Sequence, residues 1–374
     1  MKKHFNYFLL LIICTLVGFS LLFFFLLSAK TSFQKFGNTN YYFLHQLLLG
    51  LLPALVLGGI VYFIPLDFFK KWAPVLVLAN IVALFMVFLP KIGIKAGGAS
   101  RWIGIGHFAL QPSEFLKVSA ILYLSAWIAS KLSEDNASGW KSNVKKSYHN
   151  IIYILLPFLV FMGLISIGLL LQKDVTTLGI ITLTLLAVYF SAKTPIWHTL
   201  VIIAAGAGAL LLMVKFEPYR LDRWMVFLHP GQDPYGKAYQ LNQSIVSLGS
   251  GGFFGKGLGM SAQAGFVPQA MSDSIFAIIG EELGLIGCII LIGVFVLLFW
   301  EGFKIYKNSH DRFSKLTEIG IVFWISFQAL INIASVAGVF PVTGVPLPFF
   351  SYGGSHLAVE LIGMGLLLNI SKNS

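Results

Sequence analysis

The sequence predicts an all-α, polytopic membrane protein with about ten transmembrane helices and one large extracytoplasmic loop. Three observations lead to this fold class. The chain of 374 residues is 57% hydrophobic and only 11% charged, and its mean hydropathy is +0.83, which lies outside the range of soluble domains. The apolar residues gather in runs long enough to cross a bilayer. One long polar segment, 215–273, interrupts these runs.

Each long apolar run predicts one membrane span. The first run follows Lys2 and Lys3 like a signal peptide, but it is too long for one, so we expect a retained helix. The ten predicted spans are 5–28, 43–64, 72–90, 112–131, 151–171, 175–192, 196–214, 274–303, 317–339 and 352–371. An even number of spans places both termini on one side of the membrane. We expect residues 1–374 to form a single membrane domain.

The distribution of lysine and arginine predicts that both termini are cytoplasmic. The turns 65–71 and 191–195 and the loop 132–149 carry cations on the side of the amino terminus. Further cations lie on the other side, in the polar loops 91–111 and 215–273, where binding of a ligand would explain them. The net charge of +11 therefore indicates cytoplasmic anchoring and affinity for anionic lipid or phosphate, and we expect no nucleic-acid partner.

Two polar clusters lie outside the long polar segment. In the first, Arg101 and Trp102 precede Glu114 and Lys117. Glu114 and Lys117 share one helix face because they are three residues apart, and they form either an ordinary ion pair at a helix end or part of a binding site. The second cluster contains Asp174, in a tight turn between two spans. This aspartate either caps the following helix or belongs to the same site.

The segment 215–273 holds the third cluster. Its charged candidates are Arg220, Arg223, Lys256 and Asp273. Arginine forks match phosphate oxygens, and the glycines of 249–257 would let a backbone approach a ligand closely. The glycine run is not a Walker phosphate loop, because no Ser or Thr follows the lysine and no strand precedes the run. Asp273 either caps the eighth span or takes part in chemistry. The segment is too apolar in places to lie free in water, so we expect it to pack on protein at the membrane.

Several motifs resemble the SEDS family, the shape, elongation, division and sporulation proteins of the RodA and FtsW group. The similar segments, which extend over nearly the whole chain, are 101–103, 111–117, 239–244, 249–257, 275–284, 329–332 and 341–355 (PVTGVPLPFFSYGGS). The sequence departs from the family pattern beside Asp273, where Gln269, Met271 and Ser274 replace a glutamate, a histidine and an aromatic residue. It departs again at Lys173 and His356.

The resemblance implies a peptidoglycan glycosyltransferase that polymerises lipid II into glycan strands and releases undecaprenyl pyrophosphate. It implies a site on the outer face of the inner (cytoplasmic) membrane. It also implies contact with membrane lipids, lipid II and undecaprenyl-linked glycan, and a class B penicillin-binding protein transpeptidase as partner. Asp273 matches the family's essential aspartate.

These implications give each candidate residue an expected role. Asp273 is expected to be the general base that takes the proton of the acceptor sugar's 4-hydroxyl. The residues expected to bind substrate are Arg101, Trp102, Glu114, Lys117, Asp174, Arg220, Arg223 and Lys256. The cations would hold the departing pyrophosphate, and Trp102 would stack on a sugar or anchor at the interface. Asp273 and Glu114 would also be able to share a divalent cation, Mg²⁺ or Mn²⁺.

Two other functions stay open from the sequence. A lipid II flippase would need a polar path through the membrane, and Glu281, Glu282 and Glu360 lie in apolar runs where they would line one. A non-catalytic scaffold for the transpeptidase would fit the altered residues around Asp273. Residues 345–348 resemble elongation-type members, whereas 219–223 and 257–261 resemble division-type members, and together they favour the division type by a small margin.

Overall fold

The computed structural model describes residues 6–96, 99–105, 108–131, 151–192, 194, 197–216, 219–236 and 238–372. The chain forms two compact units. Unit 1 contains Met1–Phe63, Leu211–Lys304 and Val322–Lys372, and unit 2 contains Ile64–Leu210, Ile305–Ile321 and Asn373–Ser374. The expectation of one membrane domain stays a prediction, and each unit is described below by itself.

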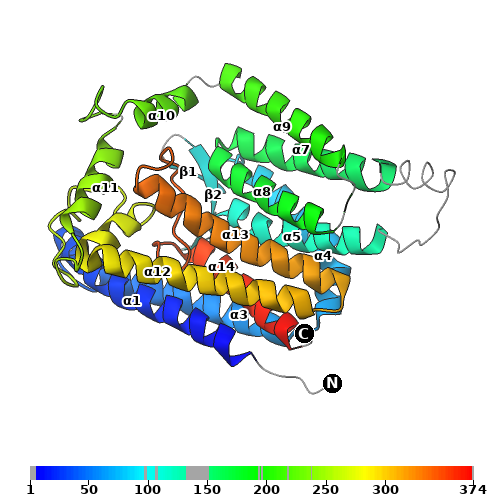
Figure 1. Cartoon of the computed structure of the whole chain (residues 1–374), viewed down its shortest axis with the longest axis horizontal. Helices are drawn as coiled ribbons and strands as arrows, with labels where there is room; N and C mark the ends of the chain where they lie inside the picture. The colour runs from blue at the N-terminus through cyan, green and yellow to red at the C-terminus, as the bar shows by residue number, and fades with distance from the viewer. Residues whose placement is uncertain are drawn as a thin grey trace. The chain divides into compact units, whose positions relative to one another are not determined.

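Every predicted span is helical, so the ten-helix prediction is confirmed (Figure 1). The helices are α1 (Tyr7–Phe36), α2, η1 and α3 in succession (Tyr41–His45, Gln46–Leu51, Leu52–Phe63), α4 (Leu66–Met86), α5 (Pro112–Lys131), η2 and α7 (Ile151–Leu155, Leu156–Leu171), α8 (Val175–Ser191), α9 (Trp197–Phe216), α12 (Ile275–Asn308), α13 (Arg312–Val336) and α14 (Gly354–Ser371). Among the described residues, seven helical stretches are long and apolar enough to cross a membrane, and two further apolar helices are shorter.

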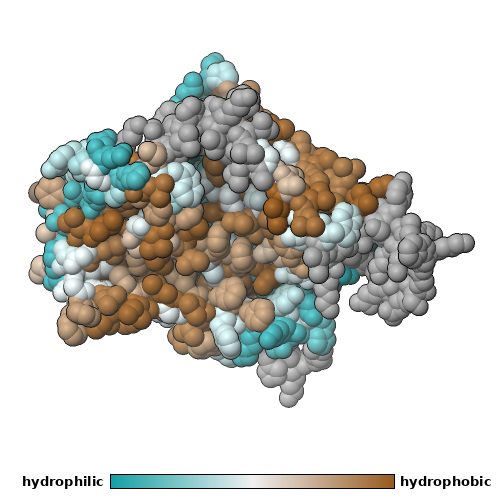
Figure 2. All heavy atoms as spheres, turned by 45° about the horizontal axis from the view of Figure 1, so that its top comes forward, coloured by the Kyte–Doolittle hydropathy of each residue, from teal (hydrophilic) through white to brown (hydrophobic). Residues whose placement is uncertain are grey.

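The surface is as apolar as a lipid-facing surface requires. Figure 2 shows apolar side chains over most of the face drawn. On α12, Ile289, Ile290 and Trp300 are 59%, 62% and 67% exposed. In water, such a surface would favour aggregation. The chain is therefore a multi-pass membrane protein, as the composition predicts.

Small residues bring α3 and α14 of unit 1 into close contact. A Cβ atom at Gly58 would lie 2.7 Å from a carbonyl oxygen of α14, and one at Gly365 would overlap the carbonyl of Gly58. The two helices run parallel, and Asn369 Nδ2 donates to Val61 O at 3.0 Å near their ends. The chain reverses at residues 37–40, between α1 and α2 (Figure 1). The start of α1 and the end of α14 therefore lie at the same end of unit 1.

The all-α prediction misses a small antiparallel sheet in the loop 91–111. Its strands are β1 (Gly93–Ala96), β2 (Ala99–Ile105) and β3 (Phe108–Leu110), in the order β1-β2-β3. Ile94 pairs with Trp102, and Ile103 pairs with Leu110. Strands this short leave little periodic signal in the sequence. The sheet holds Arg101 and Trp102 on its central strand.

The long polar segment also contains secondary structure. It holds α10 (Tyr219–Leu228) and α11 (Tyr239–Ser250), and α11 buries Leu241, Ser244 and Ser247. Ser247 Oγ donates to the carbonyl of Ala277 in α12 at 3.2 Å. The prediction that this segment packs on protein is confirmed for α11.

Candidate active site

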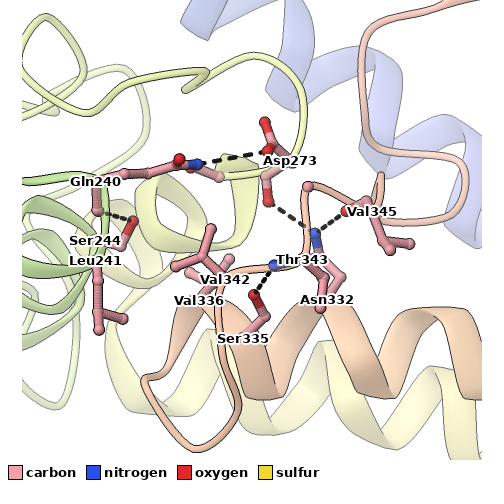
Figure 3. Close-up of a pocket in the computed structure, with 12 residues that line it drawn as sticks. Gln240, Leu241, Ser244, Asp273, Asn332, Ser335, Val336, Val342, Thr343 and Val345 are labelled. Carbon is pink, nitrogen blue, oxygen red and sulfur yellow. Dashed lines mark hydrogen bonds between the residues drawn. The ribbon is translucent and has the colours of Figure 1, made fainter. Parts of the chain in front are cut away.

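Asp273 lies in a pocket of unit 1, just before α12 begins at Ile275 (Figure 3). The residues around it come from α11, from the carboxyl-terminal part of α13 and from the segment that follows α13. They are Gln240, Leu241, Ser244, Ser274, Asn332, Ser335, Val336, Val342, Thr343, Gly344 and Val345. The pocket's free volume is about 10 Å³, which suffices for about one water molecule.

Burial and local hydrogen-bond donors have opposite effects on the pKa of the Asp273 carboxyl group. Gln240 Nε2 donates to Oδ2 at 3.4 Å, and Ser272 Oγ donates to Oδ1 at 3.1 Å. Burial raises the pKa of Asp273 above the ordinary aspartate value, although these hydrogen bonds and the positive charge of Arg223 oppose the rise. A carboxyl group with a raised pKa is a better proton acceptor than an ordinary aspartate.

The carboxylate does not serve as the cap of α12. The donors that reach it within the described residues are the side chains of Gln240 and Ser272 and the backbone amide of Asp273 itself, and all of them lie outside α12. The amide of Ala277 in the first turn instead bonds to the carbonyl of Ser274 at 3.0 Å. The capping alternative for Asp273 is therefore wrong, and its carboxylate is available to the pocket.

A buried amide on α13 fixes the backbone of the site. Asn332 is 1% exposed, and its Nδ2 donates to the carbonyls of Asp273 and Val345, both at 2.7 Å (Figure 3). The amide of Thr343 donates to Ser335 Oγ at 3.1 Å. These bonds connect α13 both to the aspartate and to the segment that follows the helix.

Gly344 leaves space beside the carboxylate. Its φ is +72°, and a Cβ atom at this position would lie 3.5 Å from Asp273 Oδ2. A side chain here would therefore strain the backbone, and its Cβ atom would occupy the space in van der Waals contact with the reactive oxygen. The glycine keeps one side of Oδ2 open to a ligand.

Arg223 is the predicted cation that the structure places in this neighbourhood. It lies on α10, and its guanidinium donates to the carbonyls of Val342 and Thr343 at 3.1 and 3.3 Å. Its charge also acts on Asp273. Arg220 lies on the same helix, but its side chain is outside the described part of the structure.

Lys256 is instead engaged with a carboxylate of α12. Its ammonium lies 2.7 Å from Glu281 Oε1, and its side chain is 34% exposed. Glu281 is fully buried and also accepts hydrogen bonds from Ser247, Ser261 and the amides of Ala262 and Gln263. Glu282 accepts one from the amide of Gly259 at 2.9 Å. These glutamates hold the segment 256–263 against α12.

The glycine run approaches protein backbone. Helix α12 is broken at Gly284, whose φ is +67° and ψ −168°. The amides of Leu285 and Ile286 bond to the carbonyls of 252 and 253 at 2.9 and 3.2 Å, and the carbonyls of 281 and 282 each accept an amide from 256 and 257 at 3.0 Å. Cβ atoms at Gly251 and Gly255 would overlap carbonyl oxygens of α12. The run thus satisfies the polar groups that the break in α12 exposes.

The other two clusters meet inside unit 2. Glu114 and Lys117 form a buried ion pair at 2.9 Å. Ser113 Oγ donates to Asp174 Oδ2 at 3.2 Å, and Asp174 accepts from the amide of Thr177 at 3.4 Å, so it caps α8. Arg101 on β2 donates to the carbonyls of 172 and 173, at 3.3 Å for the first. Trp102 is half-buried on the same strand.

The expected divalent cation would find one carboxylate in this pocket. Asp273 is the one carboxylate among the described residues that line it. More generally, no group of three or more His, Cys, Asp or Glu side chains in the described ranges is arranged to hold a metal ion. Mg²⁺ is usually held by one or two carboxylates together with substrate phosphates and water, so the cation stays a prediction, and we assign no chemical step to it.

Sequence reasoning missed the uncharged residues of the site. Gln240, Asn332, Ser335 and Gly344 received no role, although they lie in or next to motifs that resemble the family. The available signal was an amide or hydroxyl side chain within an otherwise apolar run, because a buried polar group needs a partner.

Comparison with known proteins agrees with this architecture. A family model described as cell cycle protein, for FtsW, RodA and SpoVE, matches residues 7–374. The chain is 37% identical over 367 residues to a probable peptidoglycan glycosyltransferase FtsW of Coxiella burnetii, covering 96% of this chain and 95% of that protein. It is 32% identical over 372 residues to stage V sporulation protein E of Bacillus subtilis, covering 98% and 97%.

Two solved structures share the fold. One is a chain of a peptidoglycan synthase complex, with a TM-score of 0.77 and 23% identity over 98% of this chain and 97% of that chain. The other is the rod-shape-determining protein RodA of Thermus thermophilus, with a TM-score of 0.68 and 24% identity over 98% and 96%.

Proposed function

This chain belongs to the FtsW, RodA and SpoVE family, and from that premise we propose that it is a peptidoglycan glycosyltransferase that polymerises lipid II. The observation that carries the proposal is the half-buried Asp273 carboxylate in its pocket, with a raised pKa and the charge of Arg223 acting on it. A poised base and a nearby cation are what glycosyl transfer from a lipid pyrophosphate requires.

In the proposed reaction, the Asp273 carboxylate takes the proton of the acceptor sugar's 4-hydroxyl. The hydroxyl oxygen forms a bond to the donor's anomeric carbon, and the bond from that carbon to undecaprenyl pyrophosphate breaks. The electron pair leaves with the pyrophosphate, so negative charge grows there. A positioned base contributes about 10²–10⁴-fold to the rate.

The growing charge calls for cations. We assign the stabilisation of this charge to Arg220 and Arg223 on α10 of unit 1. Arg101 and Lys117 of unit 2 stay proposed substrate-binding residues, with Glu114 fixing the ammonium of Lys117 through their buried ion pair. Trp102 lies on the same strand as Arg101 and would contact a sugar face. Lys256 and Asp174 take structural roles in this account, because Lys256 pairs with Glu281 and Asp174 caps α8.

We further propose that both termini are cytoplasmic, that the pocket faces the outer side of the cytoplasmic membrane, and that a class B penicillin-binding protein is the partner. The lysine and arginine distribution supports the orientation, as does the placement of the α1 start and the α14 end at one end of unit 1. The fold shared with a chain of a peptidoglycan synthase complex supports a partner of this kind.

A flippase gains no support from the carboxylates that would line its path. Glu281 accepts from an ammonium, two hydroxyls and two backbone amides, and Glu360 accepts from the amide of Phe349 at 2.8 Å. These groups are engaged in holding loops, which leaves glycosyl transfer as the function that the site favours.

The test uses the purified full chain together with its cognate transpeptidase and lipid II. We expect glycan strands that form in the presence of moenomycin, and none from Asp273→Ala with unchanged expression and folding. Normal polymerisation by Asp273→Ala would refute the base. Full complementation by that variant in cells, with no strands from the wild type, would indicate the scaffold, and transfer of dye-labelled lipid II across liposomes without strands would indicate the flippase.

A further inference from the structure

The pocket contains a buried acceptor atom that the structure leaves without a partner. Asn332 lines the pocket beside Asp273 and is 1% exposed. Within the described residues, its Oδ1 atom accepts no hydrogen bond. A buried amide oxygen without a donor destabilises the folded protein, so an unsatisfied atom here needs an explanation.

The orientation of this amide is fixed by its neighbours. Both partners of Nδ2 are carbonyl oxygens, those of Asp273 and Val345, each at 2.7 Å. Carbonyl oxygens only accept, so the nitrogen must face them, and both of its hydrogens are then used. Rotating the amide would place Oδ1 against two acceptors. The free atom of Asn332 is therefore an acceptor that calls for a donor from outside the protein.

The pocket indicates what kind of donor would reach it. The free space suffices for about one water molecule, and Gly344 leaves one side of Asp273 Oδ2 uncrowded. A hydroxyl group has the size of a water molecule and can donate to an amide oxygen. Sugars present hydroxyls on neighbouring atoms, so one sugar would supply both the hydroxyl that reacts and a second hydroxyl beside it.

We propose that Asn332 Oδ1 accepts a hydrogen bond from a hydroxyl of the acceptor sugar next to the one that Asp273 deprotonates. This inference rests on the proposed function and adds to it a residue that recognises the acceptor. Asn332 thereby fixes the position of the Asp273 backbone through Nδ2 and binds the acceptor sugar through Oδ1. A site that hydrogen-bonds a substrate hydroxyl discriminates strongly against an analogue lacking that hydroxyl, because its buried acceptor is then left unpaired.

The test combines variants of the protein with variants of the substrate. The probes are lipid II and two analogues whose terminal N-acetylglucosamine lacks either the 3-hydroxyl or the 6-hydroxyl. We expect the wild type to prefer lipid II over one analogue by tenfold or more in kcat/KM. In Asn332→Ala, that preference should fall to about twofold, because the variant has no oxygen to leave unpaired.

Gln328 supplies a matched control one turn earlier on α13. It is fully buried, and its Nε2 donates to the carbonyl of Pro346 at 3.1 Å, but its Oε1 already accepts from Trp324 at 2.8 Å. Gln328→Ala therefore removes a similar link between α13 and the following segment without removing a free acceptor. It should slow the reaction and keep the wild-type preference between substrates.

Loss of a merely structural link would lower the rate equally with all three substrates. The inference is overturned if Asn332→Ala keeps the full wild-type preference, or if the wild type shows no preference against either analogue. The second result needs no variant, so a folding defect in Asn332→Ala does not shield the proposal. Absence of polymer from the wild type with lipid II would refute the glycosyltransferase proposal itself.

Discussion

The carboxylate of Glu281 should control the order of the segment that bridges the break in α12. We consider the isosteric change Glu281→Gln. The donors that converge on the native carboxylate are Lys256 Nζ at 2.7 Å, Ser247 Oγ at 3.2 Å, Ser261 Oγ, and the amides of Ala262 at 3.1 Å and Gln263 at 3.2 Å. The Glu281 side chain that accepts these hydrogen bonds has no exposed surface.

The magnitude follows from the geometry. The glutamine NH₂ group would turn toward the serine hydroxyls, because hydroxyls can rotate to accept whereas an ammonium and backbone amides cannot. The bonds to Lys256 and Ala262 would then survive without the negative charge, and charge-assisted bonds are about twice as strong as neutral ones. Lys256 keeps part of its hydration, since it is 34% exposed. We therefore expect a loss of about 2–3 kcal/mol in local stability.

Amide hydrogen exchange measures this effect directly. A loss of about 2–3 kcal/mol corresponds to exchange about 30–150-fold faster at Ala262 and Gln263, if these amides exchange by local opening. Lys304→Met is the control on the same helix, because Lys304 is 64% exposed and lies 3.7 Å from Glu301, so its pair contributes at most about 1 kcal/mol. Unchanged exchange in Glu281→Gln, or equal acceleration in both variants, would refute the reasoning.

Four further predictions concern other residues. Asp273→Asn should melt at a higher temperature than the wild type at neutral pH, because the pKa of Asp273 is raised in the folded state and its charged form is therefore disfavoured there. The difference in melting temperature should vanish as the pH falls below the ordinary aspartate pKa. An unchanged melting temperature at neutral pH would contradict this prediction. In the wild type, the polymerisation rate should fall with decreasing pH at a pKa above that of an ordinary aspartate, as a pH–rate profile would show. Gly251→Ala should destabilise the folded protein by about 1–3 kcal/mol, because the added Cβ atom would overlap a carbonyl of α12. Gly249→Ala, in open space inside α11, should be neutral or stabilising. Equal changes in the melting temperatures of the two variants would count against the backbone contact at Gly251. Glu114→Gln should cost about 3–5 kcal/mol by removing the negative charge beside the buried Lys117 ammonium. Lys117→Met added to it should recover part of that loss in the same melting assay.

The helices could be predicted from the sequence because each membrane span requires a long run of apolar residues. A run of about 20 apolar residues has few alternatives in a bilayer, so all ten runs could be identified. The sheet that carries Arg101 could not be predicted in this way. Its strands are 4, 7 and 3 residues long, too short for alternation to separate them from loop.

The site was predictable in its charged members and less so in its arrangement. Asp273 stands out in the sequence because carboxylates are rare in such a chain, whereas Asn332 is one polar residue in an apolar helix, and its role depends on two carbonyls distant in sequence. For Lys256, the sequence suggested a role that its contacts in the fold do not support. A cation in a glycine-rich segment suggests a phosphate site, but only the fold brings Glu281 to 2.7 Å from it.

The measurement that bears most directly on the proposed chemistry is the rate of lipid II polymerisation by Asp273→Asn relative to the wild type. The asparagine keeps the size of the aspartate and an oxygen for Gln240 to contact, but it cannot accept the hydroxyl proton. We predict a rate below about one hundredth of the wild-type value, as expected for the loss of a general base. A folded Asp273→Asn protein that polymerises lipid II at more than about a tenth of the wild-type rate would contradict the assignment.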